Sequence, residues 1–185
     1  MGRALSGPQS GVGLIEVMIA ALILTVALMA VGMTMVQGVF AMYITQEQLV
    51  AKQKAREALE SVFTARSTQN ITFDQIRNAG AGGIFVDGYA PVRLMGNDGI
   101  ANTADDGSEP IETVTFPGPD GLLGTGDDET RVLSDFERRI VISTVMLPNG
   151  IDPDPDVRRI TVNVRFLVRG LWRTVTVSSF ISRFA

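Results

Sequence analysis

The first part of the chain is dominated by apolar residues that leave no polar face. No charged side chain lies between Glu16 and Glu47, and residues 17–36 are mostly Ile, Leu, Val, Met and Ala. A helix of this length would rise about 30 Å, which matches the hydrocarbon core of a bilayer. The pattern therefore predicts a membrane-spanning helix at this position.

The pattern becomes amphipathic between Phe40 and about Arg66. Apolar side chains recur there at three- and four-residue spacing, as expected for the buried stripe of a helix, at Ile44, Ala51, Ala55, Ala58, Leu59, Val62 and Phe63. The charged residues assigned to the opposite face are Glu47, Lys52, Lys54, Arg56, Glu57 and Glu60. Since no proline interrupts residues 12–89, we expect one continuous helix of about 50 residues.

The last third of the chain alternates between apolar and polar residues, as half-buried strands do. We expect strands at residues 138–146, 160–168 and 173–178, with a tight turn at Arg169-Gly170. Successive strands with short turns imply an antiparallel sheet that covers the amphipathic helix, and hence an α+β fold. The arginines expected on the solvated face are Arg158, Arg159, Arg165, Arg169 and Arg173.

The middle of the chain is less regular. Residues 73–78 suggest a helical turn, residues 84–86 a short strand and residues 112–116 a further β-run. Residues 152–156 alternate Asp with Pro, which is typical of a stiff extended loop.

An acidic repeat lies within residues 96–130. Residues 96–106 recur as residues 118–128 with six of eleven positions identical. The repeat resembles Asp-Gly-x-x-x-Thr-x-Asp-Asp calcium-binding loops of some bacterial surface proteins. Carboxylate oxygens suit Ca²⁺, so the sequence predicts a calcium site from Asp98, Asp105, Asp106, Asp120, Asp127 and Asp128. The alternative is a pair of ordinary acidic turns, because Asp-Gly favours turns.

Composition narrows the possible chemistry. The chain has no cysteine and no histidine, which excludes disulfides, thiolate metal sites and histidine general bases. Nine acidic residues and no Lys or Arg lie in residues 97–130, whereas residues 131–185 hold nine Arg and five acids. These arginines are spread along strands without a glycine-aromatic motif, so no nucleic-acid partner is expected.

Glu16 requires an explanation, because a carboxylate at the edge of a membrane span is costly unless it is paired. A polar leader with Arg3 precedes it, followed by Gly11 and then Leu14-Ile15-Glu16 before the apolar run. This arrangement resembles type IV prepilins and the pseudopilins of type II secretion. The resemblance extends to the order of a long helix followed by a β-meander.

The resemblance implies how the chain is processed, inserted into the membrane and assembled. A membrane prepilin peptidase would cut after Gly11 and methylate the new amine on Val12. Glu16 would pair with the N-terminal amine of a neighbouring pilin subunit during assembly. The implied domains are a leader (1–11), the membrane and assembly half of the helix (12–39) and a soluble pilin-like domain (40–185). The protein would enter the inner membrane as a single-pass precursor, contacting its lipid, with the soluble domain outside the cytoplasm.

Several functions stay open from the sequence. Major pilins tend to carry a helix-breaking proline about twenty residues into the mature chain, where this chain has Met33. Because that proline is absent and the middle of the chain is elaborate, we expect a minor pilin of a type IV pilus. A minor pseudopilin of type II secretion and a membrane-anchored calcium-dependent adhesin are the alternatives. No enzymatic activity is expected, because the acids recur as a repeat and not as one asymmetric pair of the glycoside hydrolase kind.

A secretory signal peptide or a generic membrane anchor explains less of the N-terminal pattern. A signal peptide has a shorter apolar core, of about 7–15 residues. A generic anchor accounts for the apolar length but not for Glu16 or for its spacing from Gly11.

Overall fold

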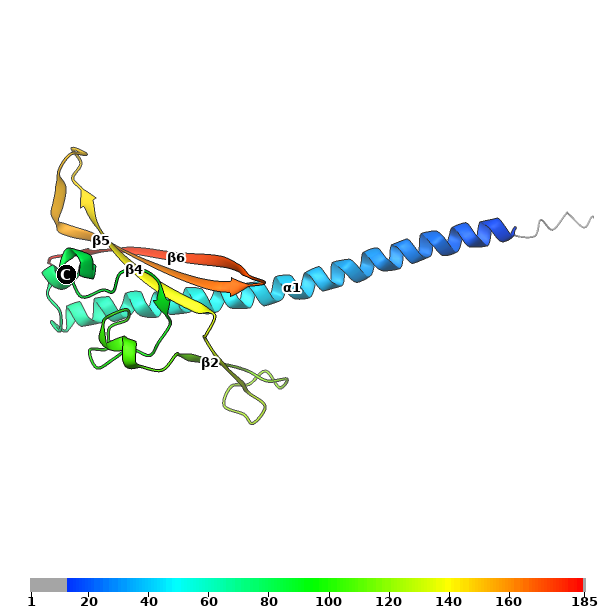
Figure 1. Cartoon of the computed structure of the whole chain (residues 1–185), viewed down its shortest axis with the longest axis horizontal. Helices are drawn as coiled ribbons and strands as arrows, with labels where there is room; N and C mark the ends of the chain where they lie inside the picture. Colours follow the sequence, from blue (N-terminus) through cyan, green and yellow to red (C-terminus); the bar gives the residue numbers. More distant parts are fainter. Residues whose placement is uncertain (1–12, 185) are drawn as a thin grey trace, which may run out of the picture. The chain divides into compact units, whose positions relative to one another are not determined.

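The computed structural model describes residues 13–184 of the chain. The chain divides into two compact units, one ending at Thr45 and the other beginning at Gln46. Figure 1 shows the helices and strands. In chain order they are α1 (Leu14–Ser67), the short 3₁₀ helices η1 (Phe73–Gln75) and η2 (Ala79–Ala81), β1 (Ala90–Pro91), η3 (Asp105–Ser108), β2 (Thr113–Phe116), β3 (Glu129–Val132), β4 (Phe136–Met146), β5 (Pro153–Val168) and β6 (Leu171–Ser182).

The expected long helix is confirmed, since α1 runs unbroken for 54 residues. Its apolar N-terminal part is long and hydrophobic enough to cross a membrane, with a mean hydropathy of 2.7, and none of that part is buried within the chain. The described residues of the first unit therefore present an uncovered apolar helix, which is compatible with a membrane anchor.

The second unit is an α+β domain, as the sequence predicts. Strands β1, β4, β5 and β6 form one antiparallel sheet in the order β1-β4-β5-β6, and the C-terminal part of α1 lies along one face of it (Figure 1). Strands β2 and β3 form a separate antiparallel ribbon. The residues of β5 that alternate inward are buried, which confirms the expected period of two at Ile160, Val162, Val164, Phe166 and Val168.

Small residues bring the helix and the sheet together. Ala51, Ala55, Ala58 and Val62 of α1 are fully buried, so the expected apolar stripe forms one side of the core. The rings of Phe136 and Phe166, on paired positions of β4 and β5, stack with centroids 5.7 Å apart. Alanines permit close approach of the helix backbone, and the larger sheet residues fill the space between the layers.

Two predictions of local structure are wrong. Residues 152–156 are not a loop, because β5 begins at Pro153 and extends past the end of β6, whose last pair is Ser182 with Val157. One edge of β5 is therefore open at Pro153 and Pro155, and a proline is tolerated there because no ladder N–H is needed. Residues 84–86 contain an isolated bridge from Phe85 to Asn78 in place of a strand.

Three charged residues assigned to solvated faces are buried instead. Glu47 and Lys54 of α1 lie inside the domain, where each is paired with an opposite charge. Arg158 of β5 points inward and donates hydrogen bonds to the carbonyl oxygens of Phe73 and Ile76. These charged residues can be buried because their ion pairs and hydrogen bonds compensate the cost of removing them from water.

Candidate functional site

The N-terminal signature falls at the limit of the described structure. Gly11 and Val12 lie outside the described residues. Glu16 lies in the first turn of α1, where its N–H donates to the carbonyl of Gly13 at 3.0 Å. Its side chain is exposed and has no ion-pair partner within residues 13–184. The partial positive charge at a helix N-terminus favours a carboxylate at this position.

The two acidic repeats fold into loops with the same internal hydrogen bonds. We call residues 96–106 the first loop and residues 118–128 the second loop. In the first loop Thr103 donates to Oδ1 of Asp105 at 2.6 Å, and in the second loop Thr125 donates to Oδ1 of Asp127 at 2.6 Å. Four further bonds, all donated by backbone N–H groups, recur in both loops. In the first loop Gly99 donates to the carbonyl oxygen of Gly96, and the carboxylates of Asp105, Asp98 and Asp106 accept from Asp98, Ile100 and Asn102, respectively. In the second loop Gly121 donates to the carbonyl oxygen of Gly118, and the carboxylates of Asp127, Asp120 and Asp128 accept from Asp120, Leu122 and Gly124, respectively.

This scaffold explains the identical positions of the repeat. A Cβ on Gly96 would lie 2.2 Å from Oδ2 of Asp105, and a Cβ on Gly118 would lie 2.3 Å from the equivalent oxygen of Asp127. The glycine at the fourth position has positive φ in both loops, a conformation that favours glycine. The invariant Thr and Asp side chains supply the remaining bonds, so the repeat encodes a loop shape.

The surroundings of these carboxyl groups shift their pKa values in opposite directions. The Thr103 hydroxyl lowers the pKa of Asp105, and the Thr125 hydroxyl lowers that of Asp127, because both stabilise the ionised form. Burial raises the pKa of Asp106, although the N–H groups of Gly96 and Asn102 act against the shift. The first loop thus holds one carboxylate at a desolvated position.

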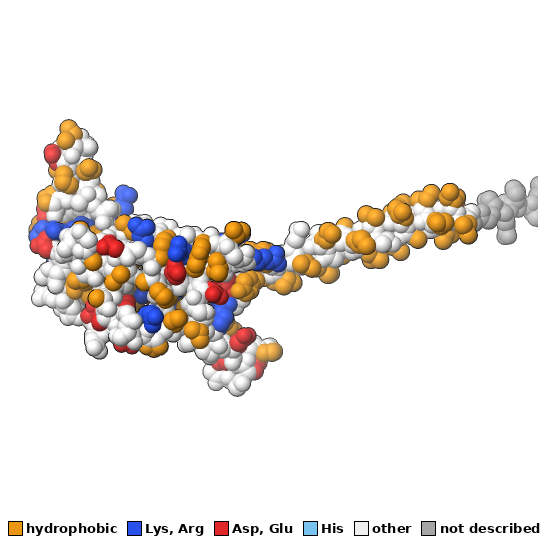
Figure 2. Space-filling view, viewed as in Figure 1, with side chains coloured by type: hydrophobic (Ala, Val, Ile, Leu, Met, Phe, Trp, Pro, Cys, Tyr) orange, Lys and Arg blue, Asp and Glu red, His pale blue; other side chains and the backbone are white. Residues whose placement is uncertain are grey.

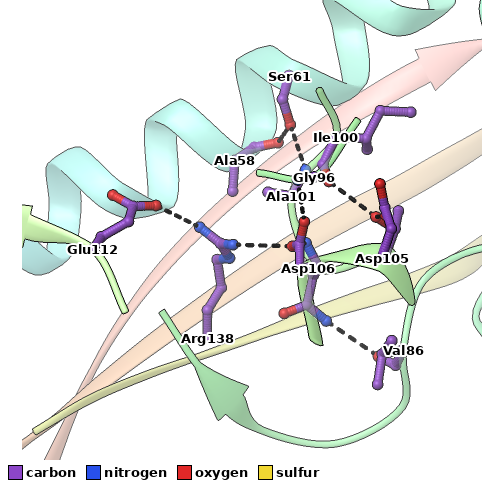
Figure 3. Close-up of polar contacts among 12 residues, drawn as sticks. Ala58, Ser61, Val86, Gly96, Ile100, Ala101, Asp105, Asp106, Glu112 and Arg138 are labelled. Atoms are coloured by element: carbon purple, nitrogen blue, oxygen red, sulfur yellow. Dashed lines mark hydrogen bonds and ion pairs between the residues drawn. The ribbon is translucent and has the colours of Figure 1, made fainter. Parts of the chain in front are cut away.

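The first loop is docked into the core of the domain (Figure 3). Ile100 and Ala101 are 1% and 0% exposed, and the N–H of Ala101 donates to Oγ of Ser61 on α1 at 3.2 Å. On the other side, Oδ2 of Asp106 lies 3.7 Å from Nη2 of Arg138 on β4. An apolar contact, a hydroxyl and a guanidinium therefore hold the first loop between the helix and the sheet.

Arg138 is part of a larger buried charge cluster. Nη1 of Arg138 lies 3.9 Å from Glu112, which in turn pairs with Lys54 of α1 at 2.5 Å. Burial alone would lower the pKa of Lys54, but Glu112 and Glu57 outweigh it and the pKa is raised. Nε and Nη1 of Arg138 have no hydrogen-bond partner within residues 13–184. Alternating charges thus link α1, β4 and the first loop.

The second loop has the same shape but a different environment. Its residues Leu122 and Leu123 occupy the positions of Ile100 and Ala101, yet they are 63% and 65% exposed. Oδ1 of Asp128 is enclosed and accepts no hydrogen bond among the described residues. The second loop is therefore a projecting copy of a loop that elsewhere in the chain is docked.

The ribbon that carries the second loop is fixed to α1 by an ion pair. Arg131 of β3 donates two hydrogen bonds to Glu47 of α1, at 2.6 and 2.7 Å. Glu47 is almost completely buried, whereas the side chain of Arg131 is one-third exposed. This bidentate contact joins the β2–β3 ribbon to the helix.

The carboxylates predicted to bind calcium are divided between the two loops. Asp98, Asp105 and Asp106 belong to the first loop, and Asp120, Asp127 and Asp128 to the second. Within residues 13–184 no three carboxylate side chains are grouped as a metal centre. Most of their oxygens instead accept N–H or O–H bonds within their own loop.

Arg138 and Arg131 were not selected from the sequence, and Glu47 was assigned to the exposed face of the helix. Arg138 could have been found, because it follows Phe136 and precedes Ile140 at a spacing of two, which places it on the inward face of its strand.

Comparison of the chain with protein-family models, with curated proteins and with solved structures found no match.

Proposed function

We propose that the chain is a pilin-like structural subunit, a minor pilin, that is cut after Gly11 and assembled into a surface filament. The supporting observation is the pairing of an uncovered apolar helix, with Glu16 in its first turn, and a compact α+β unit. Apolar side chains of the helix need lipid before assembly and other helices after it, since water would leave them unfavourably exposed.

Glu16 supplies the specificity of this proposal. A carboxylate in an apolar layer is tolerated when an opposite charge pairs with it. Cleavage after Gly11 would create a new amine on Val12, and in a filament the amine of a neighbouring subunit would lie within the same layer. The proposed ion pair then sets the register between adjacent helices.

Replacement of Glu16 tests this assembly role. We expect Glu16→Ala to leave cleavage intact and to lower incorporation into filaments at least about tenfold, because the neighbour's amine would lose its partner. Thr25→Ala, an exposed polar change in the same helix, is the control and should assemble normally. Quantitative immunoblots of sheared filaments measure both variants. Normal incorporation of Glu16→Ala would show that the ion pair is not required.

A pseudopilin of type II secretion is the nearest alternative, because it would use the same helix and the same processing. Deletion of the gene separates the two, since loss of pili supports the proposal and loss of protein secretion supports the alternative. A membrane-anchored adhesin would remain uncut and would be absent from sheared filaments.

We propose further that the acidic loops bind Ca²⁺, beginning with the second loop. Asp106 of the first loop already has Arg138 as a counter-charge, whereas Asp128 has an enclosed oxygen that accepts no hydrogen bond from the described part of the chain. A divalent cation would offset the repulsion among Asp120, Asp127 and Asp128. Binding requires these carboxylates to turn from their present N–H and O–H partners toward one ion.

Thermal unfolding of the full chain in detergent tests calcium binding. We expect millimolar Ca²⁺ to raise Tm relative to excess chelator, because a ligand of the folded form stabilises it. Asp128→Asn should reduce this shift more than Asp98→Asn, and Mg²⁺ should replace Ca²⁺ poorly. Equal Tm values in Ca²⁺ and chelator would leave the loops as acidic turns.

A further inference from the structure

The turn between β5 and β6 presents aromatic and apolar side chains to solvent. Its two central residues, Arg169 and Gly170, have φ angles of 50° and 78°, as in the tight two-residue turns that join antiparallel strands. Leu167 and Trp172 pair across the strands and are 37% and 44% exposed, and Leu171 is 69% exposed. Figure 2 shows hydrophobic and basic side chains next to each other over this end of β5 and β6.

The indole ring of Trp172 is oriented by its neighbour Arg165. The guanidinium of Arg165 lies 4.5 Å from the centroid of the Trp172 ring and 3.9 Å from that of Tyr89. The same guanidinium pairs with Glu137 at 2.5 Å. Because a guanidinium stacked on aromatic rings limits the motion of both groups, Trp172 stays partly exposed in a defined orientation.

Arginines flank the exposed apolar side chains of the turn. Arg169 at its tip and Arg173 on β6 are both exposed. Trp is enriched at membrane–water interfaces because the indole is amphipathic. Arginine can place its apolar stem along such a surface while its guanidinium reaches lipid phosphates. The combination of side chains at this turn therefore fits a phospholipid surface.

The turn lies at the end of the second unit where α1 enters it. Glu47 of α1 is paired with Arg131, whose guanidinium lies 6.0 Å from the ring of Phe136. Phe136 stacks on Phe166, which directly precedes the turn. Figure 1 shows the β5–β6 turn at the end of the sheet opposite the β4–β5 turn. The turn thus belongs to the same end of the domain as Gln46, the first residue of the unit.

The length of the charge-free run brings this end of the domain to the bilayer surface. The 30 residues between Glu16 and Glu47 carry no charge, and α1 is unbroken through them. As a helix they rise about 45 Å, which matches the thickness of a bilayer together with its two headgroup layers. If the two glutamates bound the membrane on its two sides, the β5–β6 turn is level with a headgroup layer.

The charge at this end of the domain does not favour anionic lipid. The second loop lies at the same end, because its strand β3 carries the Arg131 that binds Glu47. The carboxylates of the loop offset the arginines of the turn, so attraction to anionic headgroups is not the main contribution. Burial of the exposed apolar side chains supplies the free energy instead. A zwitterionic lipid is therefore a sufficient partner.

We propose that the β5–β6 turn is a second membrane contact of the chain. Trp172 and Leu171 enter the headgroup layer of the bilayer that holds α1, and the flanking arginines bind lipid phosphates. The contact holds the domain against the membrane before assembly, and entry into a filament requires its release. The inference goes beyond the proposed function and rests on it for the insertion of α1 in a membrane.

Tryptophan fluorescence tests the contact directly, because Trp172 is the only Trp of the chain. The full chain is reconstituted in phosphatidylcholine vesicles with or without bromine atoms on the acyl chains close to the headgroup. We expect the brominated lipid to quench the emission of Trp172. The matched control is Trp172→Phe with Phe180→Trp, which moves the reporter along the same face of β6 by about 26 Å and should abolish quenching. No quenching of Trp172, or equal quenching of both reporters, overturns the contact.

Removal of a leucine beside the reporter provides a second measurement. Leu171→Ser should shift the domain from the docked to the undocked position about tenfold, because the free energy of burying one leucine corresponds to a factor of this size. The measured result is a loss of quenching. Met146→Ser changes an exposed apolar residue at the other end of the sheet and should leave the quenching unchanged. Quenching that survives Leu171→Ser contradicts the apolar role of the turn.

The outcomes for the contact and for the proposed function are separable. A chain that floats with the vesicles but shows no quenching of Trp172 refutes the contact and leaves the membrane anchor intact, and this includes a chain whose turn is covered by another copy. A chain whose Trp172 is quenched, but that is never cut after Gly11 and never enters filaments, supports the contact and refutes the filament role.

Discussion

The glycine at the start of each acidic loop shows how one residue determines a local shape. Gly96 and Gly118 lie against the Asp105 and Asp127 side chains so closely that neither can carry a Cβ without displacing the carboxylate. A Cβ on Gly118 would also meet the backbone carbonyl oxygen of Asp127, but only the first loop is packed into the core. The same substitution should therefore have different consequences for the stability of the whole domain.

Gly96→Ala should lower the free energy of unfolding by about 1–3 kcal/mol, because displacement of Asp105 strains a docked loop. Gly118→Ala should change it by less than about 0.5 kcal/mol, since its loop contributes little to the core. Gly107→Ala, where a Cβ meets no atom within 4 Å, is the control. Denaturant unfolding of the full chain in detergent gives all three values. Equal losses at positions 96 and 118 would show that the docking of the first loop is not what stabilises it.

At the residue scale, the sequence predicts the alternation of strands better than the location of buried charges. Arg158 was assigned to the solvated face, and Arg138 was assigned to no face. Each nevertheless lies two positions before an inward residue, Ile160 and Ile140, respectively. The period of two already placed them inward. Their partners, Asp106, Glu112 and two backbone carbonyls, come from distant segments and are not visible in local sequence.

The elements depend on charged contacts where the apolar core ends. The β2–β3 ribbon is not part of the main sheet, and a two-stranded ribbon is only marginally stable by itself. Its contact with Glu47 through Arg131 therefore sets the position of the second loop. Glu47 is buried and its partner is not, so loss of the pair leaves Arg131 able to reach solvent.

Glu47→Ala should destabilise the domain by about 1–3 kcal/mol, less than a fully buried pair, because Arg131 remains partly solvated. Amide hydrogen exchange should accelerate in β2 and β3 while β4, β5 and β6 keep their protection. Glu60→Ala changes an exposed glutamate on the same helix and should leave both exchange rates and stability unaltered. Uniform acceleration across the sheet would show that Glu47 supports the core and not the ribbon alone.

At the element scale, the long helix and the three long strands follow from periodicity because each buries one continuous face. β3 and the start of β5 do not, whereas the expected β-run at residues 112–116 is confirmed as β2. β3 consists of Glu, Thr, Arg and Val, a composition without alternation, and it is stabilised by its pairing with β2 and by Glu47. The repeated loops could be recognised as equivalent from sequence, but the docking of only one could not, since it depends on Ser61 and Arg138.

The whole molecule combines an uncovered apolar helix with a compact α+β domain from which an acidic loop projects. The helix is long and apolar enough to cross a membrane. These features fit a subunit that becomes fully buried only among copies or relatives of itself.

Mass spectrometry of sheared surface filaments tests the central claim most directly, because it examines processing and incorporation in one sample. The account predicts a filament-associated chain that lacks residues 1–11 and begins with methylated Val12. It also predicts that Gly11→Val abolishes this species, since the peptidase requires the small residue before the cut. A chain that begins at Met1 or beyond residue 30, or that is missing from the filaments, would contradict the account.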